Sequence, residues 1–87
     1  MTYIHSRRYL DAGQIVQLDC DTQCNFMILT DEDFAAYQLV RQFRYHGGTV
    51  KRFPARITVP ESGHWNIIID LNGAAHEPAY TVTVVTD

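Results

Sequence analysis

The sequence predicts a mainly β fold, a jelly-roll-like antiparallel β-sandwich of about seven strands with one short α-helix at residues 32–43. Three observations indicate this fold class. Apolar and polar residues alternate in several short runs, which is the pattern of half-buried strands. Turn residues separate these runs, and only one segment has helical spacing. Because 87 residues suffice for one small core, we expect a single domain over residues 1–87.

The alternating runs define the expected strands. The first places Val16, Leu18 and Cys20 on one face and polar residues on the other. A second run follows the turn residues 21–23, so we expect these two strands to form a hairpin. Trp65 lies on the apolar face of the most hydrophobic run and is expected in the core. The runs lie at residues 16–21, 24–28, 55–59, 65–71 and 80–86.

One segment departs from this alternation. The stretch Thr30–Asp33 offers a capping side chain and acidic residues, which favour a helix start. Ala36, Leu39, Val40 and Phe43 then recur at three- and four-residue intervals, the spacing of one helix face. We therefore expect the helix at residues 32–43 to lie over an open end or edge of the sheets.

Glycine and proline predict where the chain turns. Residues 60–63, with the sequence Pro-Glu-Ser-Gly, are expected to reverse the chain between two strands. Asn72–Gly73 is a hairpin-type turn after the most hydrophobic run. Pro54 lacks a backbone N–H and is therefore expected at a strand start, a bulge or an edge.

Composition excludes several classes of protein. The net charge of −3 does not favour a nucleic-acid binder. The longest apolar stretch is only residues 26–29, so we expect no membrane association. Ser6–Leu10 contains paired arginines as an export signal does, but residues 11–14 form a turn where an apolar segment would be required, so we expect a cytoplasmic protein. No motif calls for a cofactor.

The two cysteines, Cys20 and Cys24, are interpreted as small apolar side chains of the core. A zinc site would need two further ligands at similar spacing, and no second cysteine pair exists. A disulfide across the expected hairpin is disfavoured in a cytoplasmic protein.

The placement of charge is more informative than its total. Residues 34–60 contain no acid, yet they hold five of the seven basic residues of the chain. Paired glycines in a loop let backbone N–H groups converge on an anion, arginine grips carboxylate or phosphate, and tyrosine can stack on a base or sugar. We therefore predict a basic Gly-Gly loop within residues 41–56 that binds an anionic small molecule, a nucleotide or an acidic protein partner. The predicted binding residues are Arg41, Arg44, Tyr45, His46, Gly47, Gly48, Lys51 and Arg52.

Competing interpretations remain at this stage. The glycines can simply permit a reversal from helix to strand, with the arginines covering apolar surface. An enzymatic alternative is a small hydrolase or metal-dependent enzyme that uses His46, His64 and a carboxylate in one pocket. No catalytic triad motif or metal-ligand spacing supports it, so we predict no catalytic and no metal-binding residues. A third alternative is a structural subunit that forms homo-oligomers through an edge strand or the helix face.

The chain resembles a small bacterial family, domain of unknown function 1883. The residues that carry the resemblance span nearly the whole chain, and the turn-plus-tryptophan block at residues 60–65 is the most specific of them. The resemblance implies a small β-sandwich that occurs alone or fused to TIR domains. It therefore implies a recognition or adaptor part in bacterial signalling or defence, with a TIR-containing protein as a possible partner, and it supplies no catalytic residues. The resembling segments are residues 9–13, 33–37, 44–48, 60–65 and 69–73.

Overall fold

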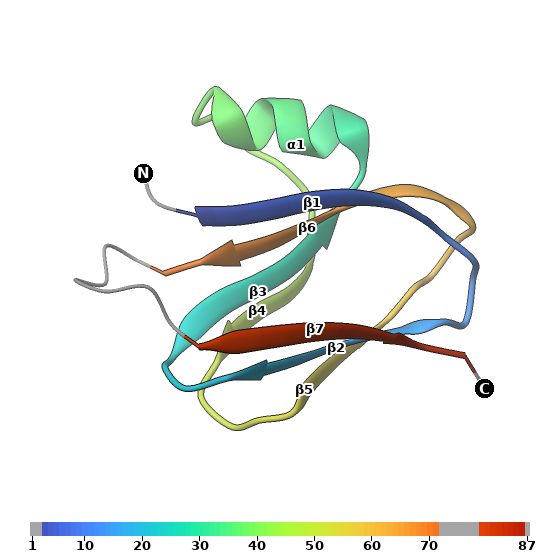
Figure 1. Ribbon diagram of the computed structural model, residues 1–87. Coiled ribbons are helices and arrows are strands. Elements are labelled where there is room, and N and C mark those ends of the chain that lie inside the picture. The colour runs from blue at the N-terminus through green and yellow to red at the C-terminus, as the bar shows by residue number, and fades with distance from the viewer. Residues whose placement is uncertain (1–2, 72–78, 87) are drawn as a thin grey trace.

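The computed structural model describes residues 3–71 and 79–86, and within them the chain forms a two-sheet sandwich with a helix on one side (Figure 1). Sheet A has the strand order β1-β6-β3-β4, and sheet B has the order β5-β2-β7. All strand pairs are antiparallel. The elements are β1 (Tyr3–Leu10), β2 (Ile15–Cys20), β3 (Cys24–Leu29), α1 (Asp31–Gln38), β4 (His46–Val50), β5 (Ala55–Thr58), β6 (Gly63–Asp70) and β7 (Tyr80–Val85).

This architecture confirms the mainly β fold class with two antiparallel sheets and one short helix. Only the connection from β3 to β4, which contains α1, stays within one sheet. Every other successive pair of strands lies in different sheets, so the chain crosses repeatedly between the layers, as in a jelly roll.

The main core lies between the sheets and follows directly from the alternation. Side chains two residues apart point to the same face of a strand, so Trp65, Ile67 and Ile69 of β6 all face sheet B. Val16 and Leu18 of β2 meet them from the other sheet. The expected core position of Trp65 is confirmed, and its indole Nε1–H donates a hydrogen bond of 2.9 Å to the Glu61 carbonyl.

A second, smaller core lies on the outer face of sheet A, where α1 covers it. The alternate residues Met27 and Leu29 of β3 and Ile68 of β6 point outward and pack against Tyr37 of the helix. The helix therefore covers a sheet face, as Figure 1 shows, and the expectation that it covers an open end or edge was wrong. Because both faces of β3 and β6 are buried, each strand contains a run of consecutive apolar residues, 26–29 in β3 and 67–69 in β6.

The helix ends at Gln38, five residues before the predicted end at residue 43. The Val40 N–H donates to the Tyr37 carbonyl at 3.1 Å and the Arg41 N–H donates to the Ala36 carbonyl at 2.9 Å. This pair of bonds is the Schellman ending, which needs a residue of positive φ. Val40 takes that position with a φ of 56° and is 80% exposed. The apolar spacing continued to Phe43 because Phe43 still packs on Tyr37, from the loop after the helix.

The predicted hairpin at residues 16–28 was also wrong. β2 pairs with β5 and β7, whereas β3 pairs with β6 and β4, so the turn between them passes from sheet B to sheet A. The turn at residues 60–63 likewise joins strands of different sheets. The expectation for Pro54 is confirmed, because it immediately precedes the edge strand β5. Asn72–Gly73 lies outside the described residues.

Cys20 and Cys24 lie at the two ends of this turn, and both are free thiols. Cys24 is buried in the main core and Cys20 is half-buried against it, as expected for small apolar side chains. Burial, reinforced by the neighbouring Cys20, raises the pKa of the Cys24 thiol to about 11. Cys24 is therefore a protonated core residue at neutral pH and a poor nucleophile.

Candidate functional site

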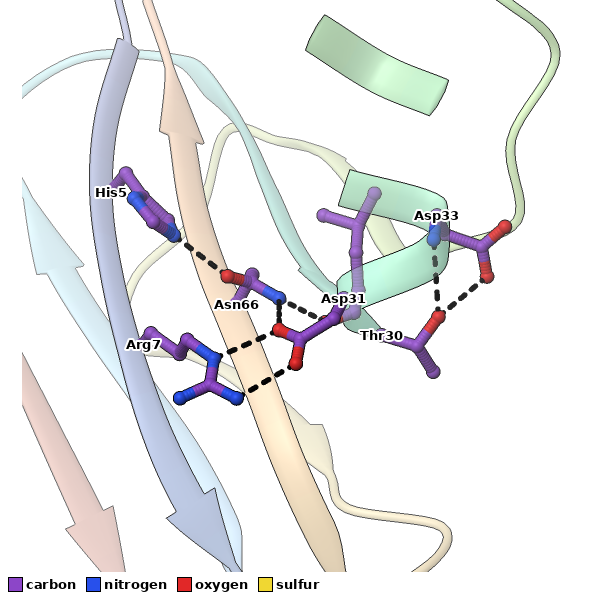
Figure 2. Close-up of polar contacts among 7 residues, drawn as sticks. His5, Arg7, Thr30, Asp31, Asp33 and Asn66 are labelled. Carbon is purple, nitrogen blue, oxygen red and sulfur yellow. Dashed lines mark hydrogen bonds and ion pairs between the residues drawn. The ribbon is translucent and has the colours of Figure 1, made fainter. Parts of the chain in front are cut away.

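A polar network fixes the first residue of α1 onto sheet A (Figure 2). Arg7 of β1 holds the Asp31 carboxylate with two hydrogen bonds, from Nε at 2.9 Å and from Nη2 at 2.8 Å. Asn66 of β6, which is only 1% exposed, donates from Nδ2 to Asp31 Oδ1 at 2.8 Å and to the Leu29 carbonyl at 3.3 Å. Its Oδ1 accepts from His5 Nε2 at 2.8 Å, and the His5 ring stacks on Phe34 of the helix.

The network also sets the protonation of its central carboxylate. The hydrogen bonds from Arg7 and Asn66 hold the pKa of Asp31 well below its usual range. The neighbouring Thr30 caps the helix, since its Oγ1 accepts from the Asp33 backbone N–H at 3.2 Å. Each labelled side chain in Figure 2 therefore forms at least one hydrogen bond within the chain, and the network attaches the helix to the sheet.

The predicted binding residues do not form one loop. Arg41, Arg44 and Tyr45 lie in the irregular segment between α1 and β4, and Lys51 and Arg52 lie beyond the far end of β4. Gly47 and Gly48 lie within β4 itself, opposite Met27 and Phe26 of β3. The expectation of a Gly-Gly loop whose backbone N–H groups converge on an anion was therefore wrong.

The close packing of β4 explains the glycine at position 47. A Cβ atom at Gly47 would lie 2.1 Å from the Phe26 carbonyl oxygen and 2.9 Å from Ile57 Cδ1, far inside van der Waals contact. Its φ of +118° also belongs to the region that glycine alone occupies readily. Gly47 thus lets β4 approach β3 and the edge of sheet B.

The basic side chains along this edge are left without carboxylate partners. Within residues 3–71 and 79–86 the Arg7–Asp31 pair is the one salt bridge, so no acid lies within 4.0 Å of the other cations there. The fifth basic residue of the acid-free segment, Arg56, donates to the neutral Gln17 side chain at 2.9 Å. We call the four exposed cations that flank β4 the cationic edge: Arg41, Arg44, Lys51 and Arg52.

The geometry of the cationic edge is elongated. Arg44 and Lys51 are seven positions apart, and five of the six residues between them form the extended strand β4. At about 3.3 Å per residue, this separation is roughly 23 Å along the chain. One small anion cannot contact both ends, whereas an extended acidic segment can.

A small cleft lies at the Arg44 end of the edge. It has a volume of about 240 Å³, which is below the range of roughly 300–1,000 Å³ typical of small-molecule pockets. The His46 ring contacts the Trp65 ring inside it at a centroid distance of 5.7 Å. Two acidic residues, Asp33 and Glu61, line it together with the basic Arg44, so the cleft is of mixed charge. Its lining residues are Ile28, Leu29, Thr30, Asp33, Arg44, His46, Pro60, Glu61 and Trp65.

Sequence reasoning did not place Thr30, Asp33, Glu61 and Trp65 beside the predicted binding residues. Asp33 accepts a hydrogen bond of 3.1 Å from the Arg44 backbone N–H, which ties the start of the helix to the segment before β4. Both Asp33 oxygens are engaged, because the second accepts from Thr30 Oγ1 at 3.0 Å. No local pattern marks this convergence, because the residues come from separate segments.

The two histidines of the enzymatic alternative lie on opposite faces of sheet A. His46 contacts Trp65, whose ring faces sheet B, whereas the adjacent His64 points to the outer face and contacts Tyr9. Ser62, next to them in the sequence, accepts a hydrogen bond of 2.9 Å from the Ala12 backbone N–H. Among the described residues, no group of three or more His, Cys, Asp or Glu side chains is arranged to hold a metal ion. The shared pocket that this alternative requires is not formed.

The fold and its surface define a class, a small antiparallel β-sandwich with a helix fixed to one sheet and an exposed row of cations along one edge. The chain belongs to the family described as Domain of unknown function (DUF1883), whose profile matches residues 1–86. No curated protein and no solved structure matches the chain. Within the described part of the chain, no helix is long and apolar enough to cross a membrane.

Proposed function

We propose that this protein is a non-enzymatic recognition module that binds an acidic segment of a partner protein along the cationic edge. The observation that supports this proposal is the contrast in charge pairing. Arg7 is paired with Asp31, whereas four exposed cations have no carboxylate within 4.0 Å among the described residues: Arg41, Arg44, Lys51 and Arg52. Unpaired cations on one side of a rigid sandwich attract and orient an acidic partner.

The spacing of the cations favours a protein segment over a small ligand. The two ends of the edge lie roughly 23 Å apart along the extended chain. A partner segment of about seven extended residues matches this length and can place carboxylates at both ends. Arginine suits the task, because its planar guanidinium binds a carboxylate with two hydrogen bonds.

A second candidate is an anionic small molecule or nucleotide bound at the Arg44 end alone. The cleft that contains Arg44 and His46 favours it. The predicted stacking residue Tyr45 does not line this cleft, and its ring contacts Phe43 instead. Such a ligand would be insensitive to Lys51 and Arg52, so mutation distinguishes the two candidates.

A wider role is part of the proposal. The resemblance seen in the sequence implies that related modules are fused to TIR domains, so we propose that the acidic segment belongs to a TIR-containing protein and that the module acts as an adaptor in bacterial signalling or defence. This proposal places the protein in the cytoplasm, where such partners would be found.

The proposal is tested by binding of a labelled ten-residue oligoglutamate peptide, followed by fluorescence anisotropy at low and high salt. We expect saturable binding that weakens with salt, because the contacts are exposed charges. The double variant Arg44→Ala plus Arg52→Ala removes one cation from each end, and we expect affinity to fall about tenfold.

A charge-matched control compares Arg52→Ala with Arg56→Ala, because Arg56 lies on β5 away from the cationic edge, and Arg56→Ala should leave affinity within about twofold. Equal losses in these two single variants would refute the proposal. If Lys51→Ala and Arg52→Ala have no effect while Arg44→Ala abolishes binding of both the peptide and ATP, the small-ligand candidate is correct instead.

A further inference from the structure

The two sheets are unequal in width, and this leaves the middle of the inner face of β1 uncovered. Sheet A has four strands and sheet B has three within the described residues. The sheets meet at β4 and β5, where a Cβ atom at Gly47 would nearly touch Ile57. Counting across from this side places β3 over β2 and β6 over β7, so no described strand of sheet B lies beneath β1.

The exposure of β1 agrees with this count. Arg8 pairs with Trp65 and Ser6 pairs with Ile67, two residues that face sheet B, so Arg8 and Ser6 point to the inner side of the sandwich. Both are nevertheless exposed to solvent. Ile4 and Leu10, at the two ends of the same face, pack on the main core, so the uncovered part of β1 is its middle, at Ser6 and Arg8.

The open edge of β7 borders this uncovered face. Figure 1 shows β1 and β7 on the same side of the molecule, and β7 pairs only with β2. Val82 and Val84 of β7 pack on the core but are only half-buried. Of the four edge strands described, β1 and β5 carry arginines and β4 contains two glycines, whereas β7 consists only of Tyr, Thr and Val. β7 thus has the composition of a strand that accepts another strand and lacks the charges that usually prevent it.

We propose that the ledge formed by Ser6 and Arg8 of β1 and by Val82 and Val84 of β7 binds an extended peptide segment, which adds to sheet B beside β7 and directs a carboxylate at Arg8. The peptide backbone satisfies the free N–H and C=O groups of β7. Every second side chain of the peptide points inward. On this face apolar residues cover the two valines, and an acidic residue contacts Arg8. This site lies on the side of the sandwich opposite the cationic edge and is independent of it.

The overhang of β1 favours a peptide over a second copy of this chain. Symmetric pairing of two β7 strands would place the β1 strand of each molecule over the β7 strand of the other. In each molecule β6 already lies over β7, so β1 of one copy would collide with β6 of the other. A single strand has no such layer above it and fits beneath β1.

The test uses two labelled peptides of alternating pattern, Thr-Val-Thr-Glu-Thr-Val-Thr and the matched Thr-Val-Thr-Lys-Thr-Val-Thr, titrated into the full chain by fluorescence anisotropy. We expect the wild type to prefer the Glu peptide, and Arg8→Glu to weaken that binding about tenfold and to prefer the Lys peptide. Arg56→Glu makes the same change of charge on β5, at the opposite edge of sheet B, and should leave both affinities unchanged. Amide hydrogen exchange should show new protection in β7.

Several results would overturn this inference. These are no saturable binding of the Glu peptide up to about 1 mM, equal binding of the two peptides to the wild type and to Arg8→Glu, or protection confined to strands other than β7. A dimer seen by light scattering that the peptide dissociates would make a second copy of the chain the natural occupant of the ledge, contrary to the proposal.

Discussion

The helix start and the cationic edge use charge in opposite ways. At the helix start, Arg7 and Asp31 satisfy one another and Asn66 completes the network from beneath the helix. Along the cationic edge, four basic side chains are exposed and meet no carboxylate in the described part of the chain. The comparison separates charge that holds the fold together from charge that is available to a partner. Five variants or measurements test that separation.

The largest expected effect comes from the strand that supports the cationic edge. Gly47→Ala would place a methyl group against the Phe26 carbonyl and impose a φ that alanine rarely adopts. We expect a loss of about 3 kcal/mol or more in the free energy of unfolding, measured by chemical denaturation. Gly48→Ala, where nothing lies within 4 Å of the added atom, should cost about 1 kcal/mol. Equal losses would show that crowding does not explain Gly47.

The next effect concerns the network at the helix start. Asn66→Ala removes partners from Asp31, His5 and the Leu29 carbonyl in a buried position. We expect a loss of about 2 kcal/mol in the free energy of unfolding. The control is Thr49→Ala, which removes an exposed cross-strand hydrogen bond to Asn25 and should cost about 0.5 kcal/mol or less. A small loss at Asn66 would mean that the network does not hold the helix.

Val40 lies between the helix and the cationic edge, and replacing it should stabilise the protein. Val40 ends the helix at a φ of 56°, a conformation that costs a branched side chain about 1–2 kcal/mol. Its side chain is exposed, so Val40→Gly removes the strain and little packing. We expect the free energy of unfolding to rise by about 1 kcal/mol, after allowing for the greater flexibility of glycine in the unfolded chain. This gain would be seen as a rise in Tm. A drop in Tm would indicate that the Val40 side chain makes a stabilising contact.

The network also predicts a dependence of stability on pH. The pKa of Asp31 is lowered in the folded protein, so its contribution is fully present above the unfolded-state value of about 3.9. The contribution is lost as the pH falls below that value. The difference in unfolding free energy between the wild type and Asp31→Asn should therefore be constant from pH 7 to pH 5 and shrink between pH 4 and pH 2.5. A difference that is unchanged at low pH would contradict this assignment.

The smallest expected effect is on the stability of the binding variant. Arg44→Ala plus Arg52→Ala removes two exposed side chains that form no ion pair among the described residues. We expect the free energy of unfolding to stay within about 0.5 kcal/mol of the wild type, as for other surface changes. A larger loss would show that these cations serve the fold, and the contrast with the Arg7–Asp31 pair would disappear.

Much of the fold was predictable because five strands face the main core along their length. In β2, β3, β5, β6 and β7 the side chains that enter this core alternate with others, and the alternation is visible in the sequence. β1 shows only part of this pattern, because Ile4 and Leu10 pack on the main core whereas Ser6 and Arg8 between them are exposed, with no described strand of sheet B beneath them. The sequence does not predict β4, because Gly47 and Gly48 are typical of a loop. In the structure they lie within the strand, and Gly47 permits its close packing.

The candidate site was predictable only in part. The acid-free stretch of the sequence identified Arg41, Arg44, Lys51 and Arg52, because local charge is a property of the chain itself. Their division between the two ends of β4 depends on the strand that separates them. Glu61 and Trp65 join Arg44 in one cleft only after the sheets have stacked.

The amino-acid sequence alone determined which residues of β2, β3, β5, β6 and β7 face the main core, where the helix begins and which stretch of chain is basic, because periodicity, capping and charge are local properties. The tertiary structure decided which sheet each strand joins, that the helix covers a sheet face and that the cations form a row. Alternation specifies which side chains share a face, but the choice of neighbouring strand depends on contacts between residues distant in the chain, such as Arg8 with Trp65 and Phe26 with Gly48.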